Sequence, residues 1–305
     1  MANSEIKEGM AGVSATVKPA SRLRDLAQLT KLRLSATVVL SSLLAYLIAQ
    51  TATVNWYPLL ILTLGGLFTT AAANSLNEVL EKDYDRQMKR TADRPLATGR
   101  MSTAEAVLLA GLWALIGISL LALFNPWTAF LGTFSLVSYA FVYTPLKRVH
   151  HSAVWVGAIP GALPVLIGCA AAEGGITDLG LTLFAIQFFW QLPHFQAIGF
   201  LGFEDYRRAG FRIVPQDANG ELRTRDLALS AVGAAALLLP LSFGPWWLGH
   251  TGLMSAGCVG IVSLVFLLFS IRFLRRTERG TALAVMFFSF AYIPLTFTLF
   301  WFDQL

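Results

Sequence analysis

The sequence predicts an all-α protein, a polytopic membrane bundle of about nine transmembrane helices. Of its 305 residues, 55% are hydrophobic and only 13% are charged, and the mean hydropathy is +0.61. This composition is typical of chains that expose most of their surface to lipid. Apolar segments long enough to cross a bilayer recur along the whole length. The recurrence favours one integral domain over several soluble ones.

Nine apolar segments have the length that a membrane-spanning helix needs. They cover residues 33–50, 57–80, 104–124, 126–144, 153–172, 178–202, 226–247, 252–273 and 281–302. Pro160 and Pro164 in the fifth segment, and Pro240 and Pro245 in the seventh, are compatible with helices whose neighbours cover the freed backbone groups. Cys169 and Cys258 lie inside apolar runs, which predicts packing roles for both.

The N-terminal end differs from the remainder of the chain. We expect residues 1–24 to be a disordered, basic, cytoplasmic tail, and residues 25–305 to form a single integral domain. Residues 21–33 are basic and amphipathic, which is typical of a segment at the membrane surface. The tail has no apolar core, and it carries Glu5 and Glu8. It therefore resembles neither a cleaved signal nor a mitochondrial transit peptide.

Charge predicts the orientation. All 23 Lys and Arg residues fall in the N-terminal segment or in the loops after the second, fourth, sixth and eighth spans. The opposite side carries Glu173, Asp178 and Asp303. The positive-inside rule places the N-terminus in the cytoplasm and the C-terminus outside. The net charge of +5 is thus explained by topology and does not indicate a nucleic-acid partner.

A column of side chains with oxygen atoms that could bind a metal lies at the end of the second span. At about 100° per residue, one helix face collects Asn74, Asn77, Glu78, Glu81 and Asp85. Asp83 points the other way. The core of the column, Asn77, Glu81 and Asp85, offers one ligand per turn and suits Mg²⁺, which is held through carboxylates together with substrate phosphates. The alternative is an acidic helix end followed by a basic cytoplasmic loop, with no metal.

Basic residues follow this column directly. Lys89, Arg90, Arg94 and Arg100 would neutralise a diphosphate that the cation bridges. Tyr143 and Lys147, one turn apart at the end of the fourth span, could donate to a diphosphate oxygen. Equally, Tyr143 could be an aromatic residue at the membrane interface, and Lys147 a base whose side chain extends to water.

The sixth span repeats the pattern. Gln187, Gln191, His194 and Asp205 fall on one stripe, with Glu204 beside them and Arg207, Arg208 and Arg212 beyond. Either Glu204 or Asp205 would bind on the opposite side of the site that holds the cation and the diphosphate. His194 is either a buried hydrogen-bonding residue or a contact for an acceptor substrate. We interpret His150 and His151 as surface residues of the loop after Arg148, and His250 as incidental.

Together these motifs resemble the UbiA superfamily of intramembrane prenyltransferases over roughly residues 25–300. The most specific runs are Met88-Lys-Arg-Thr-x-x-Arg-Pro-Leu96 and Pro193-His-Phe195 with Asp205-Tyr-x-x-Ala-Gly210. The sequence departs from the family at Glu81, where Asp is usual, and at Leu201, where many members have an acid. It departs again in the loop Val149-His-His-Ser-Ala-Val154, where Thr and Asn are expected.

The resemblance implies a helical bundle around a central cavity, Mg²⁺ as cofactor, and transfer of the farnesyl group of farnesyl diphosphate to a vinyl group of haem b in a bacterial inner membrane. It assigns Asn77, Glu81, Asp85 and Asp205 to the metal, Lys89, Arg90, Arg94 and Lys147 to the diphosphate, Tyr143 and Lys147 to catalysis, and His194 to haem. It also implies membrane lipid as surroundings, and haem A synthase or terminal-oxidase assembly factors as candidate protein partners. Two alternatives are transfer to a quinone precursor or a chlorophyllide, and transport of an isoprenoid or porphyrin.

Overall fold

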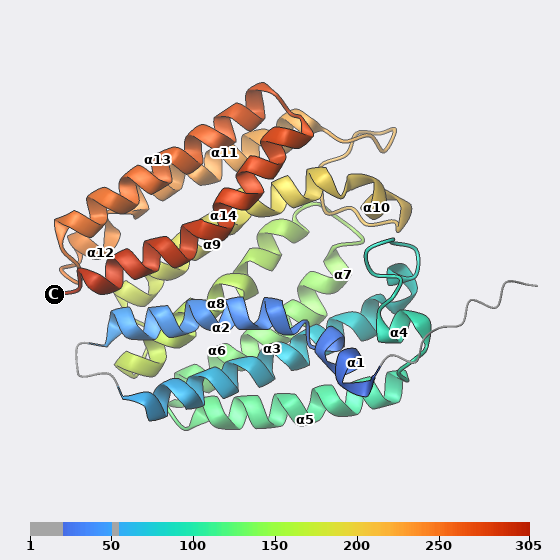
Figure 1. The fold of residues 1–305 in the computed structure, drawn as a ribbon, viewed down its shortest axis with the longest axis horizontal. Helices are drawn as coiled ribbons and strands as arrows, with labels where there is room; N and C mark the ends of the chain where they lie inside the picture. Colours follow the sequence, from blue (N-terminus) through green and yellow to red (C-terminus); the bar gives the residue numbers. More distant parts are fainter. Residues whose placement is uncertain (1–20, 51–54) are drawn as a thin grey trace, which may run out of the picture.

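The computed structural model describes residues 21–50 and 55–305. Across these residues the chain consists of helices joined by turns and loops, and its only β-type pairings are two isolated bridges. Figure 1 shows the long helices running roughly side by side, with the short helices gathered at the two ends of the bundle. The predicted all-α class is confirmed.

Nine long helical segments make up the bundle in the described part of the chain. They are α2 (Leu32–Ala49), α3 (Trp56–Asp85), α5 (Thr103–Ala122), α6 (Pro126–Val137) continued by the π-helix η1 (Ser138–Tyr143) and α7 (Thr144–Leu146), α8 (Ala153–Glu173), α9 (Asp178–Leu201), α11 (Thr224–Leu241) with α12 (Gly244–Trp247), α13 (Leu253–Arg275) and α14 (Arg279–Phe302). Eight of them are long and apolar enough to cross a membrane. The ninth, α9, is as long but carries several glutamines and a histidine.

The helix boundaries follow local signals. Side chains of Asn55, Ser102, Asn125 and Thr177 accept hydrogen bonds from backbone amides in the first turns of α3, α5, α6 and α9, as N-cap residues do. Prolines 160 and 164 lie inside α8 without ending it. Helix α3 extends five residues beyond the predicted apolar segment, which ends at residue 80, and includes the acidic column to Asp85 as the helical prediction for that column requires.

The N-terminal boundary needs a correction. Helix α1 (Arg22–Leu29) begins at Arg22, so residues 22–24, which the sequence assigned to the tail, are helical. The Ser21 hydroxyl accepts from Arg24 N and caps this helix. The remainder of the predicted tail, residues 1–20, lies outside the described residues.

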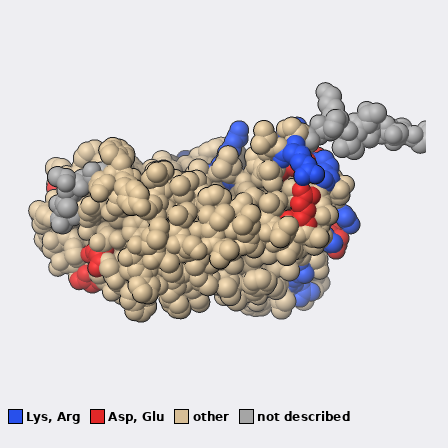
Figure 2. Space-filling model, turned by 90° about the horizontal axis from the view of Figure 1, so that it is seen from below, with Lys and Arg blue, Asp and Glu red and all other residues tan. Residues whose placement is uncertain are grey.

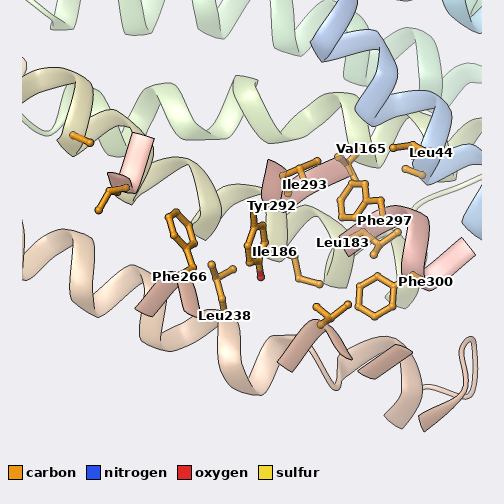
Figure 3. Packing of buried hydrophobic residues seen from close by; sticks show 14 of the residues in the cluster. Leu44, Val165, Leu183, Ile186, Leu238, Phe266, Tyr292, Ile293, Phe297 and Phe300 are labelled. Atoms are coloured by element: carbon orange, nitrogen blue, oxygen red, sulfur yellow. The ribbon is translucent and has the colours of Figure 1, made fainter. Parts of the chain in front are cut away.

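The bundle is organised around α2, α8 and α9. Helix α2 packs on α3, α8 and α14, while α9 packs on α8, α11 and α14. In Figure 3 the largest apolar cluster joins α2, α8, α9, α13 and α14 through side chains such as Leu44, Val165, Ile186, Phe266 and Phe297. Both predicted packing cysteines are free thiols, and Cys169 is fully buried.

Polar elements concentrate at one end of the bundle. Helices α1, α4 (Pro95–Thr98) and α10 (Phe203–Arg208) lie together at that end, opposite α12 and the C-terminus (Figure 1). On the face in Figure 2, Lys and Arg side chains lie in the half towards this end, and the far end shows acidic side chains without basic ones. We refer to the end with α1, α4 and α10 as the basic end.

Close contact between α2 and α8 depends on Gly168. A Cβ at this position would lie 2.1 Å from Ser42 O and 3.0 Å from Tyr46 N, both backbone atoms of α2. We expect Gly168→Ala to force the two helices apart and to lower the free energy of unfolding by about 2 kcal/mol. Gly111→Ala is the matched control, because a Cβ on Gly111 meets nothing within 4 Å. Thermal unfolding of the two purified variants checks this; equal midpoints would contradict it.

Candidate active site

The predicted column on α3 is buried at the basic end. The exposed fractions of Asn77, Glu81 and Asp85 are 2%, 4% and 0%. Asp83 is exposed and pairs with Arg86 at 3.1 Å, as expected for the opposite face. Because a buried carboxylate is costly without a counter-charge, the column requires partners, and three bases supply them.

Each main ligand of the column touches one base. Lys31 Nζ donates to Asn77 Oδ1 at 2.9 Å. Lys147 Nζ lies 2.6 Å from Glu81 Oε1, an ion pair without good hydrogen-bond geometry. Arg94 Nη1 donates to Asp85 Oδ2 at 2.7 Å. The bases come from three different segments, so the site joins α3 to the α1–α2 junction, the α3–α4 loop and the end of α7.

Lys31 was not predicted as a site residue. It is the one non-glycine residue with positive φ in the described chain, at φ 48°, a conformation that costs of order 1–3 kcal/mol. The Asn74 amide holds this junction by donating to Thr30 O and Ser35 Oγ. Burial, and then the positive charges of Arg94 and Lys147, lower the pKa of Lys31 to about 7. A strained backbone thus directs a base into the column.

The π-helix η1 presents a second wall. Its Tyr139 and Tyr143 rings lie 5.5 Å apart, and Lys147 Nζ lies 4.7 Å from the centre of the Tyr143 ring. The Asn77 amide donates to Thr144 Oγ1 at 3.0 Å. A Cβ on Gly157 would lie 2.5 Å from the Tyr143 ring, so this glycine leaves room for the tyrosine. Inserted π-turns are frequent at functional sites.

Glu78 has a different role from the rest of the column. Its Oε1 accepts from Leu96 N at 3.3 Å, at the start of α4, while Oε2 is buried without a partner. It therefore supports the loop that carries Arg94. Arg100, which was expected at the diphosphate, pairs with Asp25 at 2.9 Å and Asp93 at 3.1 Å. It ties α1 to this loop.

Lys89 and Arg90 are exposed at the basic end. Neither is part of the ion pairs in the column. The loop that follows α10 covers this region: Phe211 packs 5.5 Å from the Tyr84 ring, and Arg212 N donates to Lys147 O at 2.8 Å. Both exposed bases remain predicted diphosphate ligands.

The residues of the predicted stripe on α9 contact different parts of the structure. Gln191 is buried against α8 and donates to Ala158 O at 3.2 Å. His194 faces α14 instead, where Nδ1 lies 2.7 Å from Ser289 Oγ and the ring stacks 5.7 Å from Trp190. Beyond Gly202 the chain starts a new helix, and Asp205 lies 3.7 Å from Arg208. Asp205 as a metal ligand remains a prediction.

The buried column fits a cation. In the described chain, no three His, Cys, Asp or Glu side chains gather closely enough to hold a metal ion by themselves. However, Asp85 Oδ1 and Glu78 Oε2 are buried carboxylate oxygens without a partner, and native proteins rarely leave such atoms unpaired. With the Asn77 amide and substrate oxygens completing its ligands, a hard divalent cation suits this donor set.

The fold and this site define a membrane-embedded prenyltransferase: residues 38–292 match the UbiA prenyltransferase family, and the chain belongs to that family. Among its relatives, a protoheme IX farnesyltransferase of Cytophaga hutchinsonii is 36% identical over 94% of this chain and 99% of its own length. That of Flavobacterium johnsoniae is 38% identical, with 89% and 91% covered.

Solved structures share the fold. A digeranylgeranylglyceryl phosphate synthase matches with a TM-score of 0.75 at 17% identity, over 92% of this chain and 98% of the other. A UbiA homologue from Archaeoglobus fulgidus bound to GPP and Mg²⁺ matches with a TM-score of 0.62 at 16% identity, over 90% and 99%. At these identities the likeness concerns the fold alone.

Proposed function

We propose that this protein transfers the farnesyl group of farnesyl diphosphate to a vinyl group of haem b and so makes haem O for haem–copper oxidases. The full-length similarity to protoheme IX farnesyltransferases supports the two substrates. The observation that carries the chemistry is the buried column in which Asn77, Glu81 and Asp85 each meet a base. Such a site can hold a cation and a polyanion together.

Asn77, Glu81 and Asp85 would hold Mg²⁺, with Asp205 on the opposite side. When bound, the cation would supply charge neutralisation for the diphosphate. Lys147 and Arg94 pair with carboxylates in the structure, and on this proposal they turn to phosphate oxygens when the substrate enters. Tyr143, Lys89 and Arg90 complete the donors for the departing pyrophosphate.

The reaction then follows from charge. The bond between C1 of the farnesyl chain and the diphosphate oxygen breaks, and the electron pair leaves with pyrophosphate. The π electrons of the haem vinyl group form the new bond to C1. Water adds to the resulting cation and loses a proton, giving a hydroxyethylfarnesyl side chain. Burial of Asn77, Glu81 and Asp85 keeps bulk water from the allylic cation during the first step.

The farnesyl tail requires an apolar path below the column. A small cavity of about 30 Å³ lies between α2, α3, α6 and α8, lined by residues that include Val39, Gly66, Thr70 and Pro164. Thr70 precedes Asn74 by one turn of α3. We propose that the tail follows this direction and that the surrounding side chains move to admit it.

Product analysis tests this function against transfer to other acceptors. Purified protein, farnesyl diphosphate and Mg²⁺ are incubated with haem b, with a quinone precursor or with a chlorophyllide. Mass spectrometry of the extracted pigments should show a farnesylated haem and release of pyrophosphate. Farnesylation of another acceptor alone would replace the haem assignment. Movement of substrate across vesicles without pyrophosphate release would favour a transporter.

We place the protein in the bacterial inner membrane with the basic end in the cytoplasm. The far end of the face seen in Figure 2 shows no Lys or Arg side chains, as the positive-inside rule predicts for the outer side. A reporter that works only outside the cytoplasm should be active when fused after Leu305, and inactive when fused in the loop after Arg148. Activity at the loop position and silence at the C-terminus would invert the topology.

His194 is proposed to meet the haem. It precedes the end of α9 at Leu201 by seven residues, about 10 Å of helix, so it lies deeper than the α10 acids. We expect His194→Ala to weaken haem binding or vinyl transfer and to leave farnesyl diphosphate affinity nearly unchanged. Spectral titration with haem and a separate donor-binding assay check this. Loss of donor affinity with an unchanged haem spectrum would contradict it.

A further inference from the structure

A second cavity lies at the basic end, outside the column. It has a volume of about 520 Å³ and is bounded by the α7–α8 loop and α8, by α9, by α11, and by the loop that leads into α11. Its lining includes the exposed residues His151 and Arg223 and the partly exposed Asp226 at the rim, and Trp155, Gln196, Ser230, Gly233, Ala234 and Leu237 further along α8, α9 and α11. This volume lies within the 300–1,000 Å³ range of small-molecule sites.

The rim offers an unprotonated imidazole. Burial, and then the positive charges of His150 and Arg223, lower the pKa of His151, so the ring is neutral at pH 7. The neighbouring His150 ring is engaged, since its Nδ1 accepts from Ser152 N at 3.1 Å, and it does not line the cavity. A neutral histidine at a cavity wall is the usual form of a metal-binding imidazole.

The rim also carries Arg223, a positively charged side chain that can exchange its present partner for another. Arg223 pairs with Asp226 at 2.6 Å, but their side chains are 58% and 38% exposed. An exposed pair three residues apart contributes little to stability, so the guanidinium can turn to a carboxylate of a ligand. Among the lining residues, Arg223 is the only Lys or Arg.

Below the rim the lining is mixed: Gln196 donates to Ser230 Oγ at 3.2 Å, and Trp155, Ala234 and Leu237 supply apolar surface. Trp155 lies one turn beyond His151 and is 41% exposed. On α11, Gly233 has open space where a side chain would stand, and Leu237, 46% exposed, lies one turn further. The cavity therefore extends from the polar rim along the bundle surface, where Trp155 and Leu237 are exposed.

One loop borders both this cavity and the active site. Phe211 and Arg212 contact Tyr84 and Lys147 at the active-site end of the loop. Further along, Pro215 and Arg223 line the cavity, and Arg223 N donates to Pro215 O at 2.9 Å. A molecule bound in the cavity would thus lie beside the reaction centre without occupying it.

We propose that this cavity is a loading site for the haem acceptor, in which His151 ligates the iron and Arg223 binds a propionate. An iron porphyrin is held well where a histidine can ligate its metal, a cation can bind its carboxylates and apolar side chains can contact its ring. The cavity supplies all three. The choice of haem as occupant rests on the proposed function. The site is separate from His194, which faces α14.

Haem titration without farnesyl diphosphate tests the site. The full-length protein in detergent is titrated with haem, and the same is done for His151→Ala and for the control His150→Ala. We expect His151→Ala to raise the haem dissociation constant about tenfold and to shift the Soret band. His150→Ala removes a ring that lies 4.1 Å from the His151 ring but no proposed iron ligand, so it should change haem binding much less. Metal-free protoporphyrin should bind wild type and His151→Ala equally, because it has no iron to ligate.

The propionate contact is tested with haem dimethyl ester. It should bind the wild type more weakly than haem does, and Arg223→Gln should bind the two alike. Repeating the series with His194→Ala present keeps the two histidines apart, and the His151 effect should persist there. In turnover assays His151→Ala should raise KM for haem and leave kcat at saturating haem unchanged.

Three results would overturn the proposal. One is an unchanged haem spectrum and affinity in His151→Ala. Another is an equal loss in His150→Ala, which would assign the effect to the loop. A third is an equal loss for metal-free protoporphyrin, as expected if the cavity simply holds membrane lipid. Failure of the proposed function is a separate outcome: binding would depend on His151 as predicted while no farnesylated haem forms.

Discussion

Asp85→Ala should abolish turnover while the protein still inserts and folds. Asp85 is fully buried, its Oδ2 accepts from Arg94 at 2.7 Å, and its Oδ1 has no partner. Removing this carboxylate takes away a proposed cation ligand and leaves Arg94 without its counter-charge. We expect kcat to fall by about a thousandfold, the size of effect seen when a principal electrostatic group is lost.

Asp83→Ala is the matched control for Asp85. It removes the same charge two residues away, from an exposed side chain that pairs with Arg86, and it should keep most of the activity. Circular dichroism and the unfolding midpoint establish that both variants fold. EDTA should stop the wild-type reaction and Mg²⁺ should restore it. Similar losses in both variants would mean that the helical column is not the reaction centre.

Local sequence pattern was sufficient to predict the column and its helix. Residues that recur every four positions share a helix face whatever the surroundings, so Asn77, Glu81 and Asp85 could be placed together, and Asp83 apart, without a structure. The nine long helices followed in the same way from apolar length. Such features depend on short-range geometry, which the sequence carries directly.

The bases that contact the column could not be predicted from local sequence pattern. Lys31 reaches Asn77 across 46 residues, and its left-handed backbone at a residue other than glycine has no sequence signal. The π-helix that aligns Tyr139 with Tyr143 also departs from the regular helical period. The break between α1 and α2 at Thr30 could have drawn attention to Lys31, because a base between two helices lies near a helix end.

The α9 stripe shows a related limit. Gln191 and His194 are three residues apart and share a face by periodicity, yet one bonds to α8 and the other to α14. Helix α9 packs between these neighbours, so a stripe of ordinary width meets two different surfaces. Periodicity predicts which residues lie near each other on one helix, but the packing of other helices decides what each of them contacts.

Lys147→Met is expected to reduce both activity and stability. Lys147 is 13% exposed, its Nζ lies 2.6 Å from Glu81 Oε1, and its carbonyl is held by Arg212 N at 2.8 Å. Without the ammonium group, Glu81 is a buried carboxylate that has lost its base, which costs about 3 kcal/mol or more. The departing pyrophosphate also loses a donor, and we expect kcat to fall by about a hundredfold.

The double variant Lys147→Met with Glu81→Gln isolates the effect on stability. Removing the carboxylate as well takes away the unpaired buried charge, so the unfolding midpoint should recover most of the loss while turnover remains low. Lys82→Met removes a lysine of α3 next to Glu81 in the sequence, whose Nζ donates to Thr103 Oγ1 at 3.3 Å. This variant is the control and should leave both properties near wild type. Recovery of turnover together with stability in the double variant would contradict both proposed roles, that of Lys147 as a donor to the leaving group and that of Glu81 as a cation ligand.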